Sequence, residues 1–364
     1  MISMALANGC SRTIDSNGIS DAGVPVEAGR RAIASRDDSP IATPLPYDAA
    51  PRSPAGGCGG GRSMTVHFFD VGEALSALVD LPDGRHILVD SGDGTHRAGC
   101  GDSCETAGRR LIEGLQSDLR GSALDLLWIT HQHADHIGGA PEVLGAFRTR
   151  LYADNGRDGQ RPEVRRARAA AEDRGTAIAV VDPEHSSMPI GDSHDVRLTP
   201  IVPPVWPASC ARDPNECSIA LRIDFCASSL LFTGDAEHDE EAMLDPHGPV
   251  TLLQVAHHGS ETSTTPGFLA RVKPKYAVIS AGRPRDGYNR SFCHPRARIV
   301  QRLTRVLTGS TSSTLEAFDG ERCDRSGPAD WTRIPTSEFL WATERDGDVR
   351  LATTGDGVFH RVRP

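Results

Sequence analysis

A cluster of metal-binding residue types directly follows a buried strand, and it constrains the fold more than any other feature of the chain. The apolar run 124–129 predicts a short buried strand. Residues 131–136 then read HQHADH, with three histidines and one aspartate. Imidazole and carboxylate groups are ligands of borderline divalent metals, and four of them on one loop can serve two ions about 3.5–4 Å apart. We therefore predict a metal site at the end of this strand.

Ligands on one loop cannot enclose two ions, so further donors must come from elsewhere in the chain. The strand-like run 229–233 ends in Gly234-Asp235, and the apolar run 250–256 leads into His257-His258. A Gly-Asp pair after a strand is by itself typical of a turn. Because it follows the histidine cluster in this order, we predict that Asp235 is a ligand placed to bridge two ions.

Composition limits the class of protein. The chain has 364 residues, of which 38% are hydrophobic and 24% charged, and these values are typical of a soluble globular protein. Its apolar runs are of strand length, far short of the roughly 18–20 residues of a spanning helix, so no membrane span is predicted. The net charge of −10 argues against extensive nonspecific contact with nucleic acid but leaves a local basic cleft open.

The order of patterns predicts a disordered leader and linker over residues 1–63, rich in Ser, Pro, Ala and Gly, followed by a strand-rich body. Two strand-rich halves, each with its own helices, fit a sandwich of two sheets. Residues 311–335 lack a period and are expected to form an inserted loop. Residues 338–343 and 348–353 predict a terminal hairpin that extends one sheet. The remaining predicted elements are strands at 65–71, 76–81, 86–90, 149–153, 177–181, 195–202, 218–225, 229–233, 250–256 and 275–280, and helices at 105–119, from 141, 162–174, 266–272 and 295–307.

These pieces together resemble the metallo-β-lactamase superfamily, and in particular the nuclease-type domain of the ComEC competence DNA-uptake proteins. The resemblance covers about residues 64–307 and implies a four-layer αββα sandwich of two mixed β-sheets flanked by helices. The hydrolase domain is then expected at 64–310, with 311–364 as a loop and hairpin that extend it. The supporting strings are HFFDVG (67–72), ILVDSGDG (87–94), DLLWITHQHADHIGG (125–139), NECSIALRI (215–223), LLFTGDAE (230–237), LLQVAHHGSETS (252–263) and KPKYAVISAG (273–282).

The resemblance also implies a set of ligands for two divalent ions, zinc or manganese. It places His131 and His133 on one ion and Asp135 and His136 on the other, with Asp235 bridging. A histidine of the pair 257/258 completes the second ion. We assign His257 as this ligand and His258 as a catalytic side chain, although spacing alone leaves open which imidazole binds the metal.

Several side chains are expected to support the ligands or the substrate. The resemblance implies that Asp90, and with it Asp70, orients a ligand by a hydrogen bond. Many superfamily members supply another metal-binding histidine where this chain has Asn215 and Ser218, so one ion is expected to be weakly held. The hydroxyl of Ser260 and neighbouring backbone N–H groups are expected to contact phosphate oxygens.

The chain departs from the family pattern at two strings. Where the family commonly reads DVGQGD, this chain reads DVGEAL at 70–75. The later GHPHP string becomes FCHPR at 292–296, which keeps His294 and replaces the second histidine with Arg296. Both strings are expected to face the substrate, so these changes bear on which substrate is cleaved more than on metal binding.

The most favoured function is a phosphodiesterase that uses a metal-activated water, with DNA among the candidate substrates and no protein partner predicted. Asp135 or Asp235 could take the proton of the water, and His294 could protonate the leaving group. Two other classes stay open. A small-ester hydrolase, such as a choline-phosphate esterase, lactonase or β-lactamase, predicts a closed pocket, and a non-enzymatic binding relic predicts lost ligands.

Nine cysteines bear on where the protein works. The pairs Cys100/Cys104 and Cys210/Cys217 are close enough in sequence to form disulfides, which persist outside the cytoplasm. Cys58 follows a short small-residue string, but the apolar segment of an export signal is missing before it. The location is therefore unknown from sequence, with no recognisable signal peptide and cysteine pairs that favour an extracytoplasmic site.

Overall fold

The computed structural model describes residues 61–94 and 102–362. The leader predicted for residues 1–63 therefore lies, up to residue 60, outside the described residues. The domain boundaries at 64, 310 and 311 stay predictions.

The first sheet has eight strands in the order β16-β15-β1-β2-β3-β4-β5-β6. Strands β1 to β3 are antiparallel neighbours, whereas β3 to β6 are parallel. The bounds are β1 (Met64–Phe68), β2 (Ala77–Asp80), β3 (His86–Val89), β4 (Leu126–Trp128), β5 (Leu151–Asp154), β6 (Ala177–Val180), β15 (Val349–Thr353) and β16 (His360–Arg361).

The second sheet has six strands in the order β14-β11-β10-β9-β8-β7. It too is mixed, because β7 to β9 are antiparallel and β9, β10, β11 and β14 are parallel. The bounds are β7 (Val196–Ile201), β8 (Ala220–Phe225), β9 (Ser228–Phe232), β10 (Leu252–Gln254), β11 (Tyr276–Ile279) and β14 (Leu340–Ala342).

The described part of the chain contains nine α-helices. They are α1 (Asp102–Leu119), α2 (Ala134–Ile137), α3 (Ala140–Ala146), α4 (Pro162–Asp173), α5 (His238–Met243), α6 (Pro266–Val272), α7 (Asn289–Phe292), α8 (Ala297–Val306) and α9 (Thr343–Asp346). Most of the predicted helices agree with these bounds to within a few residues.

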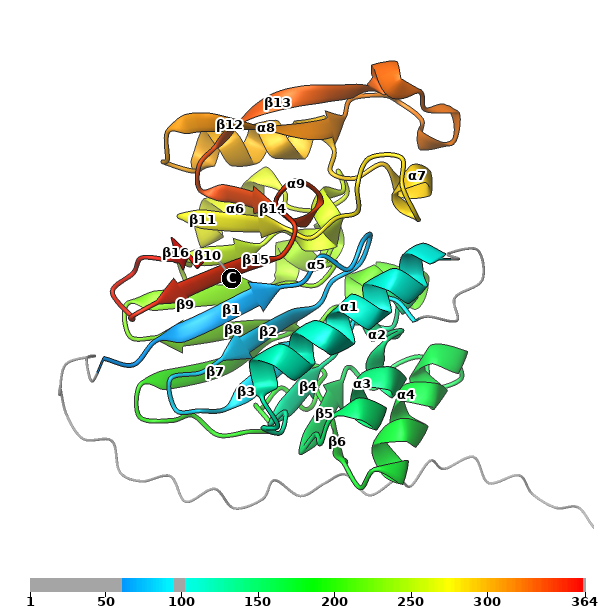
Figure 1. Ribbon diagram of the computed structural model, residues 1–364, viewed down its shortest axis with the longest axis vertical. Helices are drawn as coiled ribbons and strands as arrows, with labels where there is room; N and C mark the ends of the chain where they lie inside the picture. Colours follow the sequence, from blue (N-terminus) through cyan, green and yellow to red (C-terminus); the bar gives the residue numbers. More distant parts are fainter. Residues whose placement is uncertain (1–60, 95–101, 363–364) are drawn as a thin grey trace, which may run out of the picture. The chain divides into compact units, whose positions relative to one another are not determined.

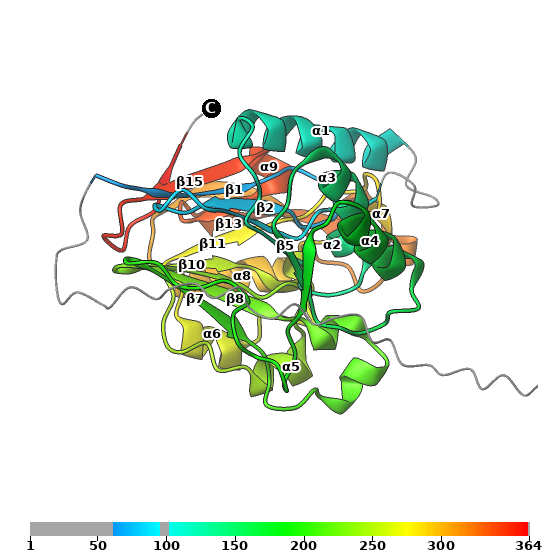
Figure 2. The ribbon, with the colours of Figure 1, turned by 90° about the horizontal axis from the view of Figure 1, so that it is seen from below.

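The helices and sheets form four layers, and the period of two along the strands explains why (Figures 1 and 2). In β4, Leu126 and Trp128 belong to the core between the two sheets, whereas Leu127 packs with α1, α3 and α4. In β10, Leu252 faces the inner core and Leu253 packs with α6 and α8. Each sheet is therefore apolar on both faces, and the predicted αββα sandwich is confirmed.

The prediction of a loop at 311–335 is wrong. Strands β12 (Thr311–Phe318) and β13 (Trp331–Ser337) pair in antiparallel fashion as a separate two-stranded sheet. This hairpin lies next to α8 (Figure 1), where Leu315 and Ile334 join its buried residues. The first half of β12 is mostly exposed and rich in Ser and Thr, so its sequence has no apolar alternation that would predict a strand.

The prediction of a terminal hairpin at 338–353 is also wrong. Strand β14 runs parallel to β11 in the second sheet, whereas β15 pairs with β1 in the first. The Arg-Asp-Gly string that suggested a tight hairpin turn lies at the end of α9, which connects the two sheets. Partners distant in sequence, rather than the local turn, decide where each strand pairs.

Among the described residues, two cysteine pairs with both members described have disulfide geometry. The sulfurs of Cys210 and Cys217 are 2.08 Å apart, and those of Cys293 and Cys323 are 2.03 Å apart. The second pair joins α7 to the loop of the β12–β13 hairpin and was not predicted. The Cys100/Cys104 prediction involves a residue outside the described ranges. Within those ranges no helix is long and apolar enough to cross a membrane.

Candidate metal centre

The candidate centre lies where three parallel strands end. The loop after β4 carries residues 131–136, Asp235 follows β9, and the histidine pair 257/258 follows β10. Strand β4 belongs to the first sheet and β9 and β10 to the second, so both sheets contribute to one site.

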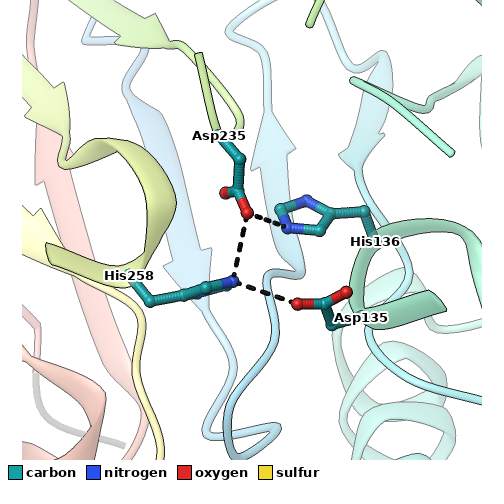
Figure 3. Close-up of side chains that lie close together, drawn as sticks. All are labelled: Asp135, His136, Asp235 and His258. Carbon is teal, nitrogen blue, oxygen red and sulfur yellow. Dashed lines mark ion pairs between the residues drawn. The ribbon is translucent and has the colours of Figure 1, made fainter. Parts of the chain in front are cut away.

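Four side chains converge on a common point (Figure 3). Asp135, His136, Asp235 and His258 each offer one ligand atom, and these atoms all lie within 4.8 Å of one another. The Oδ2 of Asp235 is 3.1 Å from His136 Nε2 and 3.5 Å from His258 Nε2. The same His258 nitrogen is 3.4 Å from Asp135 Oδ2. We call these four residues the carboxylate half of the centre.

The carboxylate half fits a divalent ion. Tetrahedral coordination at ion–ligand distances of roughly 2.0–2.1 Å separates ligand atoms by about 3.3 Å, close to the spacing here. His136 Nε2, His258 Nε2 and Asp235 Oδ1 are buried and make no hydrogen bond. Buried polar atoms left without hydrogen bonds are costly. Imidazole nitrogens and carboxylate oxygens without other partners are a suitable donor set for zinc, manganese or iron.

Hydrogen bonds behind the imidazoles aim them at this point. Asp90 Oδ2 is 2.7 Å from His136 Nδ1, and the other oxygen of this carboxylate accepts the backbone N–H of Thr130 at 2.7 Å. His258 Nδ1 is 2.6 Å from the backbone carbonyl of Ser280. Each contact fixes the ring so that Nε2 faces the ligand cluster.

Burial and charge set the protonation of these groups. Burial raises the pKa of Asp90, which nevertheless pairs with an imidazole. Burial alone lowers the pKa of His136, but the carboxylates of Asp235 and Asp90 raise it well above its usual range. In the same way Asp235 and Asp135 raise the pKa of His258 to about 9 against the effect of burial. Both imidazoles must lose a proton when they bind a metal.

The turn that presents Asp235 depends on glycine. Gly234 has a φ of +55°, and a Cβ there would lie 2.6 Å from the Thr130 Cβ. Only glycine fits this backbone without strain. The backbone N–H of Asp235 lies 3.3 Å from Ser218 Oγ, which places Ser218 behind the ligand as a support.

His131, His133 and Asn215 form a second group beside the first, and we call it the imidazole half. His131 Nε2 is 3.1 Å from His133 Nδ1, which lies 2.7 Å from Asn215 Oδ1. His131 Nε2 is also 4.0 Å from Asp235 Oδ2, so Asp235 lies between the two halves. Burial, reinforced by nearby His136, lowers the pKa of His131 well below its usual range and keeps this imidazole neutral.

The geometry of the histidine pair differs from the assignment expected from the sequence. His257 and His258 have φ values of +48° and +53° within η3 (Ala256–Gly259), so their rings lie on different sides of the turn. His258 joins the carboxylate half, whereas His257 Nδ1 pairs with Glu237 Oε1 at 2.9 Å and its Nε2 is 3.9 Å from Asp235. Left-handed backbone at a residue other than glycine costs about 1–3 kcal/mol. The geometry therefore favours His258 as the ligand in place of His257.

A pocket of about 590 Å³ opens onto the centre. His294 lines it and pairs through Nδ1 with Glu73 Oε1 at 2.7 Å. The other Glu73 oxygen accepts the backbone N–H of Gly282 at 2.9 Å. Burial lowers the pKa of His294, although Glu73 opposes it. His294 is thus placed as a neutral imidazole that must first take a proton before it can act as the acid expected from the sequence.

Of two further expected supporting residues, Asp70 lies away from the ligands and Ser260 lines the pocket. Asp70 does not reach the ligands, because its carboxylate pairs with Arg283 at 3.2 Å and Arg110 at 3.7 Å in a neighbouring pocket. Ser260 does line the metal pocket, and its hydroxyl lies 3.0 Å from that of Thr262.

Sequence reasoning missed several residues around the centre. Glu73 was visible as a departure from the DVGQGD pattern, but nothing in the sequence connects it with His294. Glu240 lies in an acidic run, yet its side chain is buried and accepts the Ser218 N–H at 3.0 Å. Other lining side chains come from distant segments, namely Arg161, Arg212, Glu237, Phe292, Arg296 and Cys323.

Comparison with known proteins identifies the family. The profile of the Metallo-beta-lactamase superfamily matches residues 70–283, which include every residue of both halves. The chain belongs to the metallo-beta-lactamase superfamily.

Its curated relatives include competence proteins and ribonucleases. Recombination protein 2 of Haemophilus influenzae is 30% identical over 254 residues, covering 69% of this chain and 28% of that protein. ComE operon protein 3 of Bacillus subtilis is 30% identical over 265 residues, covering 69% and 32%. Ribonuclease Z of Clostridium beijerinckii is 35% identical over 119 residues, covering 32% of each chain. The chain thus spans about a third of the length of these relatives.

Proposed function

We propose that the protein is a binuclear metal-dependent phosphodiesterase. The observation that supports this most is the carboxylate half, four converging donors that are fixed from behind and adjoin a second group of imidazoles through Asp235. Relatives named as a recombination protein and as ribonuclease Z support a nucleic-acid substrate.

The charges around the pocket suit a phosphodiester. Arg161, Arg212 and Arg296 line it in a protein whose net charge is −10. Guanidinium groups bind phosphate oxygens with charge-assisted hydrogen bonds. The Ser260 hydroxyl adds a donor on the same lining. A small neutral ester offers no negative charge to these guanidinium groups, so a phosphodiester is favoured over the small-ester alternative.

The side chains that would hold the metals are those of both halves, with His258 in place of His257. Bound divalent ions would lower the pKa of a coordinated water and polarise a phosphoryl oxygen. Zinc or manganese fits the donors. Because Glu73 accepts a hydrogen bond from Nδ1–H of His294, Nε2 of this ring is free to take a proton from the water. Water then bonds to phosphorus, the P–O ester bond breaks, and the leaving oxygen receives that proton.

Metal analysis followed by assays on three substrates tests this function. We expect up to two divalent ions per chain, hydrolysis of bis-p-nitrophenyl phosphate and single-stranded DNA, and loss of both activities on chelation. Nitrocefin, a β-lactam, represents the β-lactamase-like alternative and is expected to be a poorer substrate. Full activity in metal-free protein, or a preference for nitrocefin, would contradict the proposal.

We also infer that the protein works in an oxidising compartment. Both described cysteine pairs adjoin the site, since Cys210 and Cys217 bracket Asn215 and Cys323 lines the pocket. Disulfides of this kind persist outside the cytoplasm. Alkylation of protein purified from its source, followed by mass spectrometry, should find these four thiols unlabelled. Complete labelling would place the protein in a reducing compartment.

A further inference from the structure

An exposed aromatic ring lies at the edge of the metal pocket. Phe292, the last residue of α7, is 40% exposed. Across residues 61–94 and 102–362, four large hydrophobic side chains are 38% or more exposed, and Phe292 is the aromatic one among them and the one that lines the pocket. Its ring is stacked on that of His294, with centroids 6.1 Å apart and an interplanar angle of 25°. The outer part of the ring is therefore open to a planar group.

An unneutralised guanidinium lies two residues beyond His294. The Arg296 group sits 4.8 Å from the centroid of the Phe318 ring. Its Nε is buried and makes no hydrogen bond, and among the described residues the carboxylate of Glu261, whose charge acts on it from a distance, lies 4.0 Å from Arg298 instead. Burial lowers the pKa of this guanidinium, which nonetheless stays charged. A buried N–H donor on a permanent cation that lines a pocket requires an anion or water as its partner.

Hydrogen bonds and a disulfide fix the backbone of residues 289–296, the segment that carries both side chains. Asn289 Oδ1 accepts the backbone N–H of His294 at 2.7 Å, and Asn289 Nδ2 donates to the His294 carbonyl at 2.6 Å. The backbone N–H of Arg296 donates to the Gly259 carbonyl at 3.0 Å, and Cys293 is joined to Cys323. Because these groups are ordered before any ligand binds, little conformational entropy is lost on binding.

We propose that Phe292 and Arg296 form a subsite for one unpaired nucleotide of the substrate strand, a proposal that rests on the function proposed above. The base stacks on Phe292 and a backbone phosphate pairs with Arg296, so the subsite selects single-stranded over double-stranded nucleic acid. Stacking of a base on an aromatic side chain contributes about 1–3 kcal/mol and is tolerant of sequence. Arg296 stands where the family string described above has its second histidine, so a guanidinium replaces an imidazole at this position.

Binding of two labelled oligonucleotides tests the subsite without turnover. The probes are a ten-residue thymidylate strand with hydrolysis-resistant phosphorothioate links and the same strand with abasic sites, each followed by fluorescence anisotropy with the full-length metal-loaded protein. We expect the thymidylate strand to bind at least about tenfold more tightly than the abasic one. Annealing a complementary strand should abolish this preference.

Three variants separate the two contacts. Phe292→Ala should reduce the base preference to less than about twofold while leaving the affinity for the abasic strand unchanged, and Phe292→Tyr should keep the preference. Arg296→Ala should weaken both strands equally and reduce the salt slope of binding by about 1. Arg298→Ala is the matched control, since that side chain is 75% exposed on the same helix.

The outcomes distinguish this proposal from the proposed function. Equal binding of both strands by the native protein would overturn the subsite, even if phosphodiesters are hydrolysed. It would also be overturned if Phe292→Ala lowered the affinity for both strands equally. The same holds if Arg296→Ala and Arg298→Ala changed the affinities by the same amount. A base preference that depends on Phe292 in a protein that hydrolyses no phosphodiester would uphold the subsite and contradict the phosphodiesterase.

Discussion

The two halves of the candidate centre differ in how their donors are arranged. In the carboxylate half, two carboxylates and two imidazoles from both sheets point at one position, and the rings are fixed from behind by Asp90 and by the Ser280 carbonyl. In the imidazole half, His133 contacts both His131 and Asn215, and an amide stands where many superfamily members have an imidazole. Under the proposed binuclear function, this comparison predicts that an ion in the carboxylate half is held tightly and one in the imidazole half weakly.

Removal of Asp235 should have the largest effect, because this carboxylate is common to both halves. Asp235→Ala should lower the hydrolysis rate at least about a thousandfold, since the several kcal/mol of charge stabilisation that metals supply correspond to one factor of ten per about 1.4 kcal/mol. Rate measurements with bis-p-nitrophenyl phosphate, together with metal content, check this. Glu261→Ala, at a carboxylate that is 48% exposed, is the control, and equal rates in both variants would show that Gly234-Asp235 is only a turn.

Variants of the two neighbouring histidines test which of them is the metal ligand. His258→Ala removes a donor of the carboxylate half and should lower metal affinity and activity about 100-fold, whereas His257→Ala should lower them about tenfold or less. Titration with a competing chelator gives the affinities. A larger loss in His257→Ala would restore the assignment made from the sequence.

Substitution of Asp90 tests whether the carboxylate behind His136 raises the metal affinity of the carboxylate half. Asp90→Asn keeps an acceptor for the Thr130 N–H but removes the charge beside His136, and we expect metal affinity to fall about 10–100-fold. Asp80→Asn provides a matched comparison, because Asp80 pairs with His86 at the same 2.7 Å away from the centre. Indistinguishable affinities for the two variants would mean that Asp90 only supports the fold.

Asn215 should give the smallest effect, and in the opposite direction. Asn215→His supplies an imidazole to the imidazole half and should raise the affinity for the second ion by up to about tenfold, with the first ion unchanged. Metal stoichiometry after dialysis against graded chelator concentrations measures both. Asn215→Ala should show no gain, and a gain in that variant would point to relief of a steric contact instead of a new ligand.

The sequence predicts the ligands better than it predicts their surroundings. Residues 131–136 and 235 are recognisable because each follows directly on an apolar strand, and the strand ends then meet at one edge of the sandwich. The choice between His257 and His258 was not predictable, since it depends on two consecutive left-handed residues. The pocket wall was missed because Glu73, Arg161, Arg212 and Phe292 converge only through tertiary packing.

In the fold, too, the features set by local sequence were predicted and those set by distant partners were not. Most of the core strands and helices have clear apolar periods and were found close to their observed bounds. Strands β12 and β14 were missed or misplaced because their partners determine them, Arg333 lying opposite Glu316 in one case and Ala277 opposite Leu340 in the other. Local turn chemistry cannot decide between a neighbouring strand and one from a distant part of the chain.

The short helix α9 makes the sandwich indivisible. It separates β14, in one sheet, from β15, in the other, by only a few residues. A chain divided between β6 and β7 would leave β1 as an unpaired edge of buried apolar residues, because β15 would remain with the other piece. Such an edge invites pairing with other chains. Although the candidate metal ligands come from two sheets, the sandwich is not two interchangeable modules, and recombination between halves of different relatives is expected to disrupt it.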